Sequence, residues 1–244
     1  MTSIEIVDNP QKAQQLAQVL TSVWGETNAI SVDVIIAVVH SGGYASLASR
    51  KAGTANRIIG GSLALVGRHE NKLHSHVTGV VGDAVNSGVG RALKQHQWVW
   101  AKENNFAAIS WTFDPLVRRN AHFNLVTLGA KVVSYHRDFY GELNDKINAS
   151  DSTDRLVVER HVADCDLAPN AKTVTAEHGD ETISTPEDIV VLRQSANLPD
   201  QALVRQWRQD QRENFESAFA ASKFVRGFTA DGCYVLSSRF GELN

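Results

Sequence analysis

The residues best suited to chemistry form a glycine-bearing segment that joins a predicted strand to a predicted helix. Gly82 opens this segment, and Gly88-Val89-Gly90 closes it at the start of an amphipathic stretch. Glycines allow a tight turn and a close backbone approach to a ligand, while the free N–H groups and the dipole at a helix start attract phosphate. The segment therefore predicts an anion site, although a plain strand-to-helix turn has the same pattern.

Two common phosphate-binding motifs are absent from the sequence. No G-x-x-x-x-G-K-[ST] occurs, and the dinucleotide pattern G-x-G-x-x-G fails because Leu93 stands at its third glycine. ATP and NAD are therefore not the expected ligands.

Histidines near the glycine segment are candidates for acid–base chemistry. His74 and His76 lie two residues apart on the predicted strand before the loop, hence on one face, and imidazole titrates near neutral pH. His76 is the preferred base and His122 a second catalytic candidate, although packed or solvent-facing histidines look the same in a sequence. An H-x-H pair also binds metals, but no third ligand is evident, so no metal is expected.

The order of predicted elements is that of an α/β protein. Strands are expected at residues 4–7, 44–49, 57–66, 73–81, 107–113, 132–135, 156–159 and 234–236. Helices are expected from the Asp8-Asn9-Pro10 start to Gly25, at 34–39, after the glycine segment, from Asp114-Pro115 to Gly129, and from about Asp200.

Burial on two of these helices is predicted from the sequence pattern. The helix after the glycine segment is expected to bury Val89, Ala92, Leu93, His96, Val99 and Trp100. On the C-terminal helix, Arg205, Arg208 and Arg212 alternate with acidic residues, which favours a solvated face. Residues 161–187 lack periodicity and are expected to form a connecting excursion.

Length and charge restrict the class of protein. The chain has 244 residues, 43% of them hydrophobic, which suffices for one large domain or two small ones. Its formal net charge of -3 gives no general attraction to nucleic acid or to an anionic membrane. The two cysteines match no CxxC pattern, and no apolar run has the length of a membrane span. We expect a cytoplasmic protein with neither nucleic-acid nor membrane partners.

With this element order, residues 4–136 resemble the GCN5-related N-acetyltransferase (GNAT) superfamily. The superfamily motif Q/R-x-x-G-x-G/A falls on Val85-Asn86-Ser87-Gly88-Val89-Gly90, with Val85 in place of Gln or Arg. Thr112 to Leu125 and later segments up to Leu156 are similar to a subgroup of acetyltransferases of unassigned substrate. The resemblance implies a GNAT-like acyl-CoA N-acyltransferase fold in residues 1–160, a mixed central sheet flanked by helices, with a C-terminal α/β extension in residues 161–244.

The resemblance also implies a binding site for acetyl-CoA or another acyl-CoA as co-substrate. It places Val80, Val81 and Gly82 along the pantetheine arm, and Val85, Asn86, Ser87, Gly88, Val89, Gly90 and Arg91 around the pyrophosphate. Asn120 and Asn124 are candidates for the pantetheine amides, and Tyr135 or Tyr140 for the thiol. The tyrosine that many members use as an acid falls on Leu125, and the usual pantetheine asparagine on Arg118, so these two assignments do not transfer.

The activity implied by the resemblance is acyl transfer to an amine of a small molecule or peptide, by direct attack in a ternary complex. The alternative is a noncatalytic acyl-CoA-binding or regulatory module, which Val85 and Leu125 favour. Superfamily members are often dimers, so a homodimer is compatible with the resemblance. The acceptor and the acyl chain length are left open by the sequence.

Overall fold

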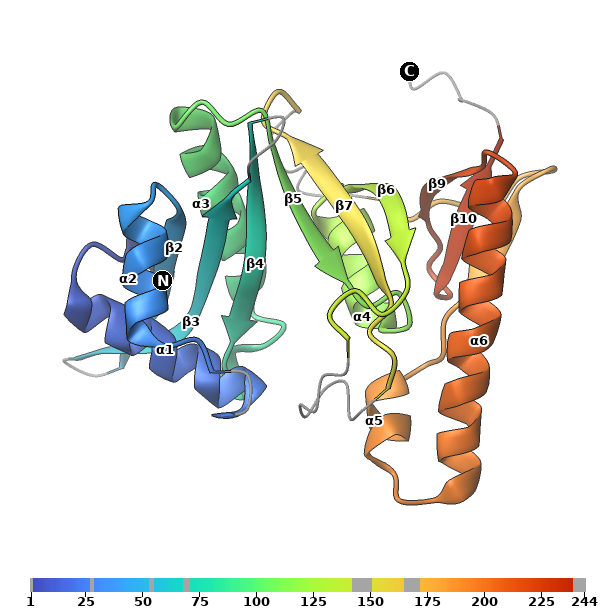
Figure 1. Cartoon of the computed structure of the whole chain (residues 1–244), viewed down its shortest axis with the longest axis horizontal. Coiled ribbons are helices and arrows are strands. Elements are labelled where there is room, and N and C mark those ends of the chain that lie inside the picture. Colours follow the sequence, from blue (N-terminus) through green and yellow to red (C-terminus); the bar gives the residue numbers. More distant parts are fainter. Residues whose placement is uncertain are drawn as a thin grey trace. The chain divides into compact units, whose positions relative to one another are not determined.

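The computed structural model describes residues 2–26, 29–52, 55–67, 71–141, 151–164 and 172–238 (Figure 1). The chain divides into two compact units. Unit 1 comprises Met1–Trp111 with Arg160–Asp166, and unit 2 comprises Thr112–Glu159 with Leu167–Asn244. The expected division into an acyl-CoA-binding core, residues 1–160, and a C-terminal extension, residues 161–244, stays a prediction.

Unit 1 is built on antiparallel strands that end in one parallel pair. Strands β1 (Thr2–Ile6), β2 (Tyr44–Ala52), β3 (Ala55–Val66) and β4 (Lys72–Val80) pair in this order, and β5 (Ala108–Phe113) begins beside the start of β4. The helices are α1 (Pro10–Trp24), α2 (Val32–His40) and α3 (Val89–Glu103). This mixed sheet with flanking helices confirms the predicted fold class.

Helices α1 and α3 cover opposite faces of this sheet (Figure 1). A Cβ at Gly61 would collide with Leu16 of α1, whereas one at Gly60 would crowd Leu93 of α3. Adjacent residues of a strand point to opposite faces, so the two glycines bring a helix close to each side. Asn9 caps α1 by accepting a hydrogen bond from the Lys12 backbone N–H at 2.9 Å, which confirms the predicted helix start.

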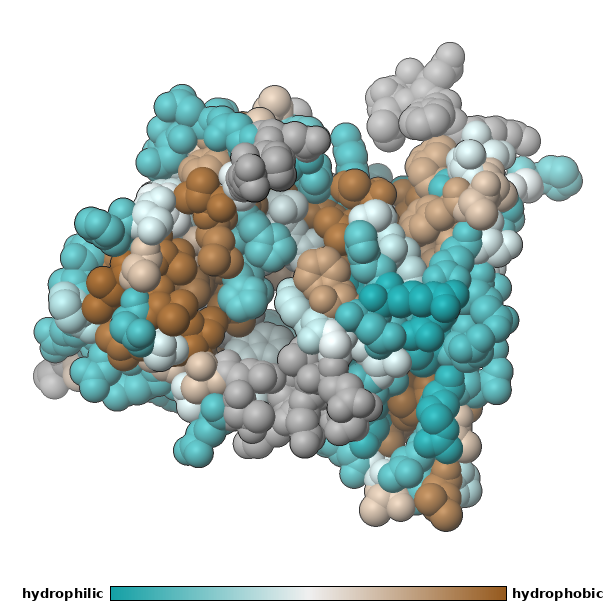
Figure 2. Space-filling model, viewed as in Figure 1, coloured by the Kyte–Doolittle hydropathy of each residue, from teal (hydrophilic) through white to brown (hydrophobic). Residues whose placement is uncertain are grey.

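Helix α2 leaves apolar side chains on the surface of unit 1. Val34 and Ile36 are exposed on the helix, and Leu65 and Val66 are exposed at the end of β3. Figure 2 shows apolar surface over α2. Among the described helices, none combines the length and the apolar composition that crossing a membrane requires.

Unit 2 contains two antiparallel groups of strands and the longest helix. β6 (Lys131–His136) pairs with β7 (Arg155–His161), and β10 (Cys233–Ser237) lies between β8 (Glu181–Ser184) and β9 (Phe224–Phe228). Its helices are α4 (Arg118–Ala121), the π-helix η3 (His122–Thr127), α5 (Ile189–Gln194) and α6 (Leu198–Ala220). Phe215 of α6 is fully buried, and its ring lies 5.1 Å from that of Tyr234.

A buried ion cluster, consisting of Asp114, Asp151, Arg193 and Arg208, joins the segments of unit 2. The Arg193 guanidinium donates to Asp114 at 2.6 Å and to Asp151 at 2.7 Å, and Arg208 reaches the same carboxylates at 3.0 and 2.9 Å. Burial alone would raise the pKa of Asp114, but the charges of Arg208, Arg193 and Arg155 outweigh burial and hold this pKa well below its ordinary value.

The ion cluster explains two predictions that were wrong. No helix begins at Asp114-Pro115, because Asp114 accepts from the Leu116 backbone N–H in a turn and helix α4 begins only at Arg118. Arg208 is buried rather than solvated, because two carboxylates from distant segments neutralise it. Residues 161–187 were expected to form a connecting segment without regular structure. Part of this segment, β8, forms a strand because it pairs with β10.

We expect Asp114→Asn to lower the free energy of unfolding by about 3–5 kcal/mol, because it removes one charge of a buried pair and leaves arginines uncompensated. The matched control is Asp210→Asn on the exposed side of α6, which should change stability by less than about 0.5 kcal/mol. Urea denaturation at pH 7 measures both. Equal effects of the two variants would contradict a stabilising role for the cluster.

Candidate functional site

The glycine loop lies between β4 and α3 within unit 1. Gly82–Ala84 forms a short 3-10 turn, and Asn86 and Gly88 have positive φ angles of 64° and 83°. Gly88 is the N-cap of α3, so no capping side chain occupies the first N–H groups of this helix. No described atom comes within 4 Å of where a Cβ would stand at Gly82 or Gly88. The loop therefore presents open backbone to a ligand.

Two arginines from distant strands set the charge at the loop. Arg57 of β3 holds Asp83 with two hydrogen bonds of 2.5 and 2.9 Å, and this lowers the pKa of the Asp83 carboxyl. Arg50 of β2 donates to the Ser87 hydroxyl at 3.1 Å. Since Arg57 offsets the charge of Asp83, Arg50 gives the loop a positive charge. Nothing in the sequence near Arg50 marks its approach to the loop, so Arg50 was not among the predicted site residues.

The second feature of the site is the divergence of β4 from β5. These strands pair at only three positions, from Lys72–Ala108 to His74–Ser110, and β4 then continues through Ser75–Val80. On its other edge, Ser75 and Val77 oppose the consecutive residues Ala64 and Leu63 of β3. His76 is therefore the extra residue of a β-bulge, a feature that re-aims side chains and is common next to active sites.

The histidines of β4 lie together, as the two-residue spacing predicts. The ring centroids of His74 and His76 are 6.5 Å apart. Burial lowers the pKa of His74, and the charges of His76 and Lys94 lower it further. His76 is the more exposed of the two residues, and the partial burial of its imidazole lowers its pKa as well. Both imidazoles are therefore neutral at pH 7 and able to accept a proton.

Helix α3 buries a different face from the one predicted. Val89 and Leu93 are buried as expected, but Val99 is 40% exposed, and Ala92, His96 and Trp100 are only partly buried. The buried face is Val89, Leu93, Lys94, Gln97, Trp98 and Ala101. Lys94 and Gln97 are too polar to be predicted as core residues. Both are buried because serine hydroxyls of the sheet accept their hydrogen bonds.

Lys94 belongs to a buried polar network that the sequence did not reveal. Its ammonium donates to the Ser75 hydroxyl at 2.8 Å and to the Gln97 carbonyl oxygen at 3.3 Å, and it lies 3.9 Å from the centroid of the Trp111 ring. Gln97 in turn donates to the Ser62 hydroxyl at 3.2 Å. Within the described parts of the chain no carboxylate pairs with Lys94, and burial lowers its pKa to about 7.

The remaining predicted site residues belong to unit 2 and are described within it. Asn124 is buried, Asn120 is half-buried and His122 is exposed. The Tyr140 hydroxyl is 3.0 Å from the Thr112 hydroxyl, and the Tyr135 hydroxyl donates to Asp154. Burial, followed by this bond to Asp154, raises the pKa of Tyr135, so it is a poor proton donor. Roles for His122, Tyr140, Asn120 and Asn124 stay predictions.

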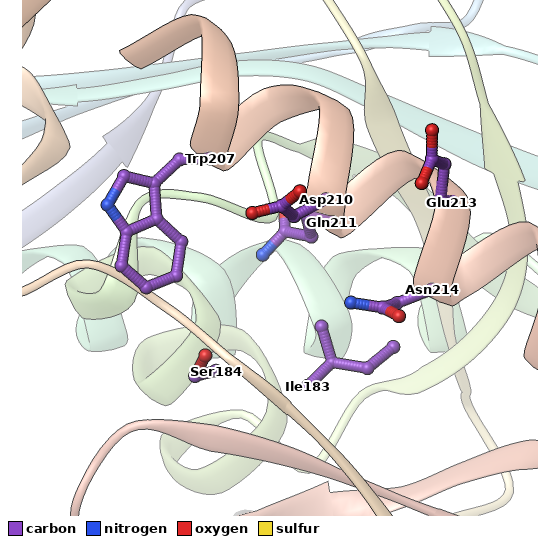
Figure 3. Close-up of a pocket in the computed structure, with 7 residues that line it drawn as sticks. All are labelled: Ile183, Ser184, Trp207, Asp210, Gln211, Glu213 and Asn214. Carbon is purple, nitrogen blue, oxygen red and sulfur yellow. The ribbon is translucent and has the colours of Figure 1, made fainter. Parts of the chain in front are cut away.

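Unit 2 also has a cavity of about 300 Å³ between β8 and α6 (Figure 3). Figure 3 shows Asp210 and Glu213 on α6 among the lining residues. Each carboxylate accepts a hydrogen bond from a glutamine one turn earlier, Gln206 and Gln209 respectively. The remaining lining residues are Ile183, Ser184, Trp207, Gln211 and Asn214. Because its carboxylates already have partners on their own helix, this cavity offers less defined chemistry than the glycine loop.

Comparison with known proteins identifies the fold. No protein-family model matches the sequence, and no curated protein matches it. The ribosomal-protein-S18-alanine N-acetyltransferase from Escherichia coli matches with a TM-score of 0.53 at 11% identity, over 68% of this chain and 96% of that one. The yncA protein of Salmonella typhimurium, solved with acetyl-CoA, matches with a TM-score of 0.53 at 11% identity, over 70% and 99%. The chain therefore has the GNAT acetyltransferase fold, as the resemblance implied.

We expect Lys94→Met to stabilise the protein, because methionine fills the same buried space without a charge. The wild-type pKa of about 7 lies below the unfolded value of 10.5, so the unfolded chain binds the extra proton between these limits. Wild-type stability should rise with pH across this window, and the advantage of Lys94→Met should shrink accordingly. Thermal unfolding at pH 7 and pH 10 measures this.

The matched control for this prediction is Lys102→Met on the exposed side of α3, whose effect should not change with pH. An advantage of Lys94→Met that is the same at both pH values would contradict the buried, unpaired ammonium.

Proposed function

We propose that the protein is an acyltransferase that moves an acetyl or other acyl group from acyl-CoA to an amine. One observation carries the proposal: the edge of β4 that leaves β5 runs directly into an open glycine loop and the uncapped start of α3. The free edge of β4 suits an extended chain with amide groups. The glycine loop and the start of α3 suit a phosphate. The acetyl-CoA complex of one structural neighbour supports the same ligand.

The residues of this chain fit acyl-CoA at both ends. Val80, Val81 and Gly82 would line the arm with backbone groups, and Val85 to Arg91 would surround the pyrophosphate. Val85 lacks the polar side chain of the family motif, but Arg50 brings a cation to the same loop through Ser87. Backbone donors and Arg50 together replace the missing side chain.

Catalysis requires the acceptor amine to lose a proton. Bound acyl-CoA would supply the thioester that the amine attacks directly, in a ternary complex. His76 is our candidate for the base, because it is the extra residue of the bulge on the edge of β4 that leaves β5, and its lowered pKa keeps it neutral at pH 7. His74, on the same strand, is the less exposed of the two residues and serves as the control for His76.

A noncatalytic acyl-CoA-binding module is the second candidate. Leu125 stands where many superfamily members carry the acid, and Tyr135 is engaged with Asp154. Such a module would bind acyl-CoA but release no thiol with any amine. The acceptor, a small molecule or a peptide, and a homodimeric state are further predictions of the resemblance.

We expect Gly88→Trp to abolish acetyl-CoA binding, because an indole would fill the open space at the start of α3. The matched control is Gly42→Trp after α2, which has a similar φ of 85° and meets only Val66 at 3.9 Å, at the opposite end of β3 from the pair with Val80. Calorimetric titration of both variants separates ligand exclusion from backbone strain. Full binding by Gly88→Trp, or equal losses in the two variants, would count against the site.

We expect His76→Ala to lower kcat by at least about 100-fold, the usual contribution of a general base, with His74→Ala affected far less. The wild-type rate should fall as the pH falls through the lowered pKa of His76, because protonation removes the base. Thiol release with an amine acceptor measures both. If the rate of His76→Ala fell with decreasing pH in the same way as the wild-type rate, another group would be the base.

A further inference from the structure

Lys94 lies at the fork, which we define as the point where β4 and β5 part. His74 and Ser110 form the last pair of the parallel ladder, and Ser75 and Trp111 are the next residue on each strand. The Lys94 ammonium contacts both of these residues, donating to Ser75 and facing the Trp111 ring. One cation from α3 therefore touches both strands at the position where they separate.

The ammonium at the fork is costly for a structural residue. Burial without a carboxylate partner penalises the charge, and a methionine or leucine would pack there without that penalty. The Lys94 ammonium has three N–H donors and bonds to the side-chain oxygens of Ser75 and Gln97. Both of these acceptors are neutral. Groups whose pKa is strongly shifted cluster at functional sites, and this one also contacts both diverging strands.

The fork also lies at a suitable distance from the glycine loop. The strand from Val80 back to Ser75 spans about 16 Å, counting about 3.3 Å per residue. An extended pantetheine arm has a comparable length. If the phosphates lie at the loop and the arm follows β4, as the proposed function requires, the thioester end falls at the fork.

We propose that Lys94 is the acid that protonates the sulfur of CoA as the acyl group leaves. This inference rests on the proposed function. The acceptor nitrogen forms a bond to the acyl carbon and loses a proton to the base, the C–S bond breaks, and its electron pair stays on sulfur. The Lys94 ammonium gives one proton to that sulfur, and the proton that the base releases to water restores the ammonium. A pKa near 7 allows both steps at neutral pH.

The first test reads the thiol itself. CoA is bound to wild type, Lys94→Met and the control Lys102→Met, and thiolate absorbance is followed against pH, with desulfo-CoA complexes subtracted. The subtraction removes the titration of His74, the neighbouring group that senses Lys94. The ammonium and the thiolate stabilise each other, so Lys94 stays protonated beside the thiolate. We therefore expect the thiolate midpoint to be at least one pH unit lower in wild type and Lys102→Met than in Lys94→Met.

The second test separates chemistry from binding. Lys94→Met should lower kcat by about 100-fold while the Kd for acetyl-CoA changes less than threefold, because the lost interaction acts on the leaving group. Ser75→Ala, which removes the hydroxyl that orients the ammonium, should shift the thiolate midpoint and kcat in the same direction by smaller amounts.

The outcomes distinguish this inference from the proposed function. Equal thiolate midpoints in wild type and Lys94→Met, with CoA bound by both, would overturn the role of Lys94 and leave the proposed function intact. Failure of the wild type to bind CoA would overturn both.

Discussion

The divergence of β4 from β5 is the constraint on which the candidate site depends. After three pairs, β4 leaves its neighbour, and the bulge at His76 marks the start of the departure. The free edge that results would otherwise need a partner, since unpaired backbone groups are unfavourable when buried. Lys94 contacts both strands at this divergence, and β4 then runs into the glycine loop. The histidine, the lysine and the loop therefore lie along one edge of one strand.

Buried charges have opposite characters in the two units. In unit 2, Asp114 and Asp151 neutralise Arg193 and Arg208 with short, reciprocal contacts, which is how a fold tolerates charge in its interior. In unit 1, Lys94 has only neutral acceptors among the residues that the structure describes. We infer that the first arrangement serves stability and the second serves chemistry, because selection for stability alone would have replaced Lys94 with an apolar residue.

Local signals in the sequence predicted the elements well. The Asn9 cap, the glycine loop, the strand before it and the helix after it each depend on neighbouring residues, and each was found. The predictions that were wrong involve partners far apart in the chain. Asp114 resembles a helix cap until Arg208, on a distant helix, is seen to pair with it. Lys94 appears solvated until Ser75 and Trp111 lie beside it, so tertiary contacts, not propensity, decide these positions.

Amide hydrogen exchange with and without acetyl-CoA shows whether β4 and the glycine loop together hold acyl-CoA. Saturating acetyl-CoA should slow exchange in two connected stretches of unit 1, Ser75–Val80 and Gly82–Arg91, because both would donate to the ligand or lie beneath it. Unchanged exchange in both stretches, or protection confined to the cavity between β8 and α6, would contradict this binding site.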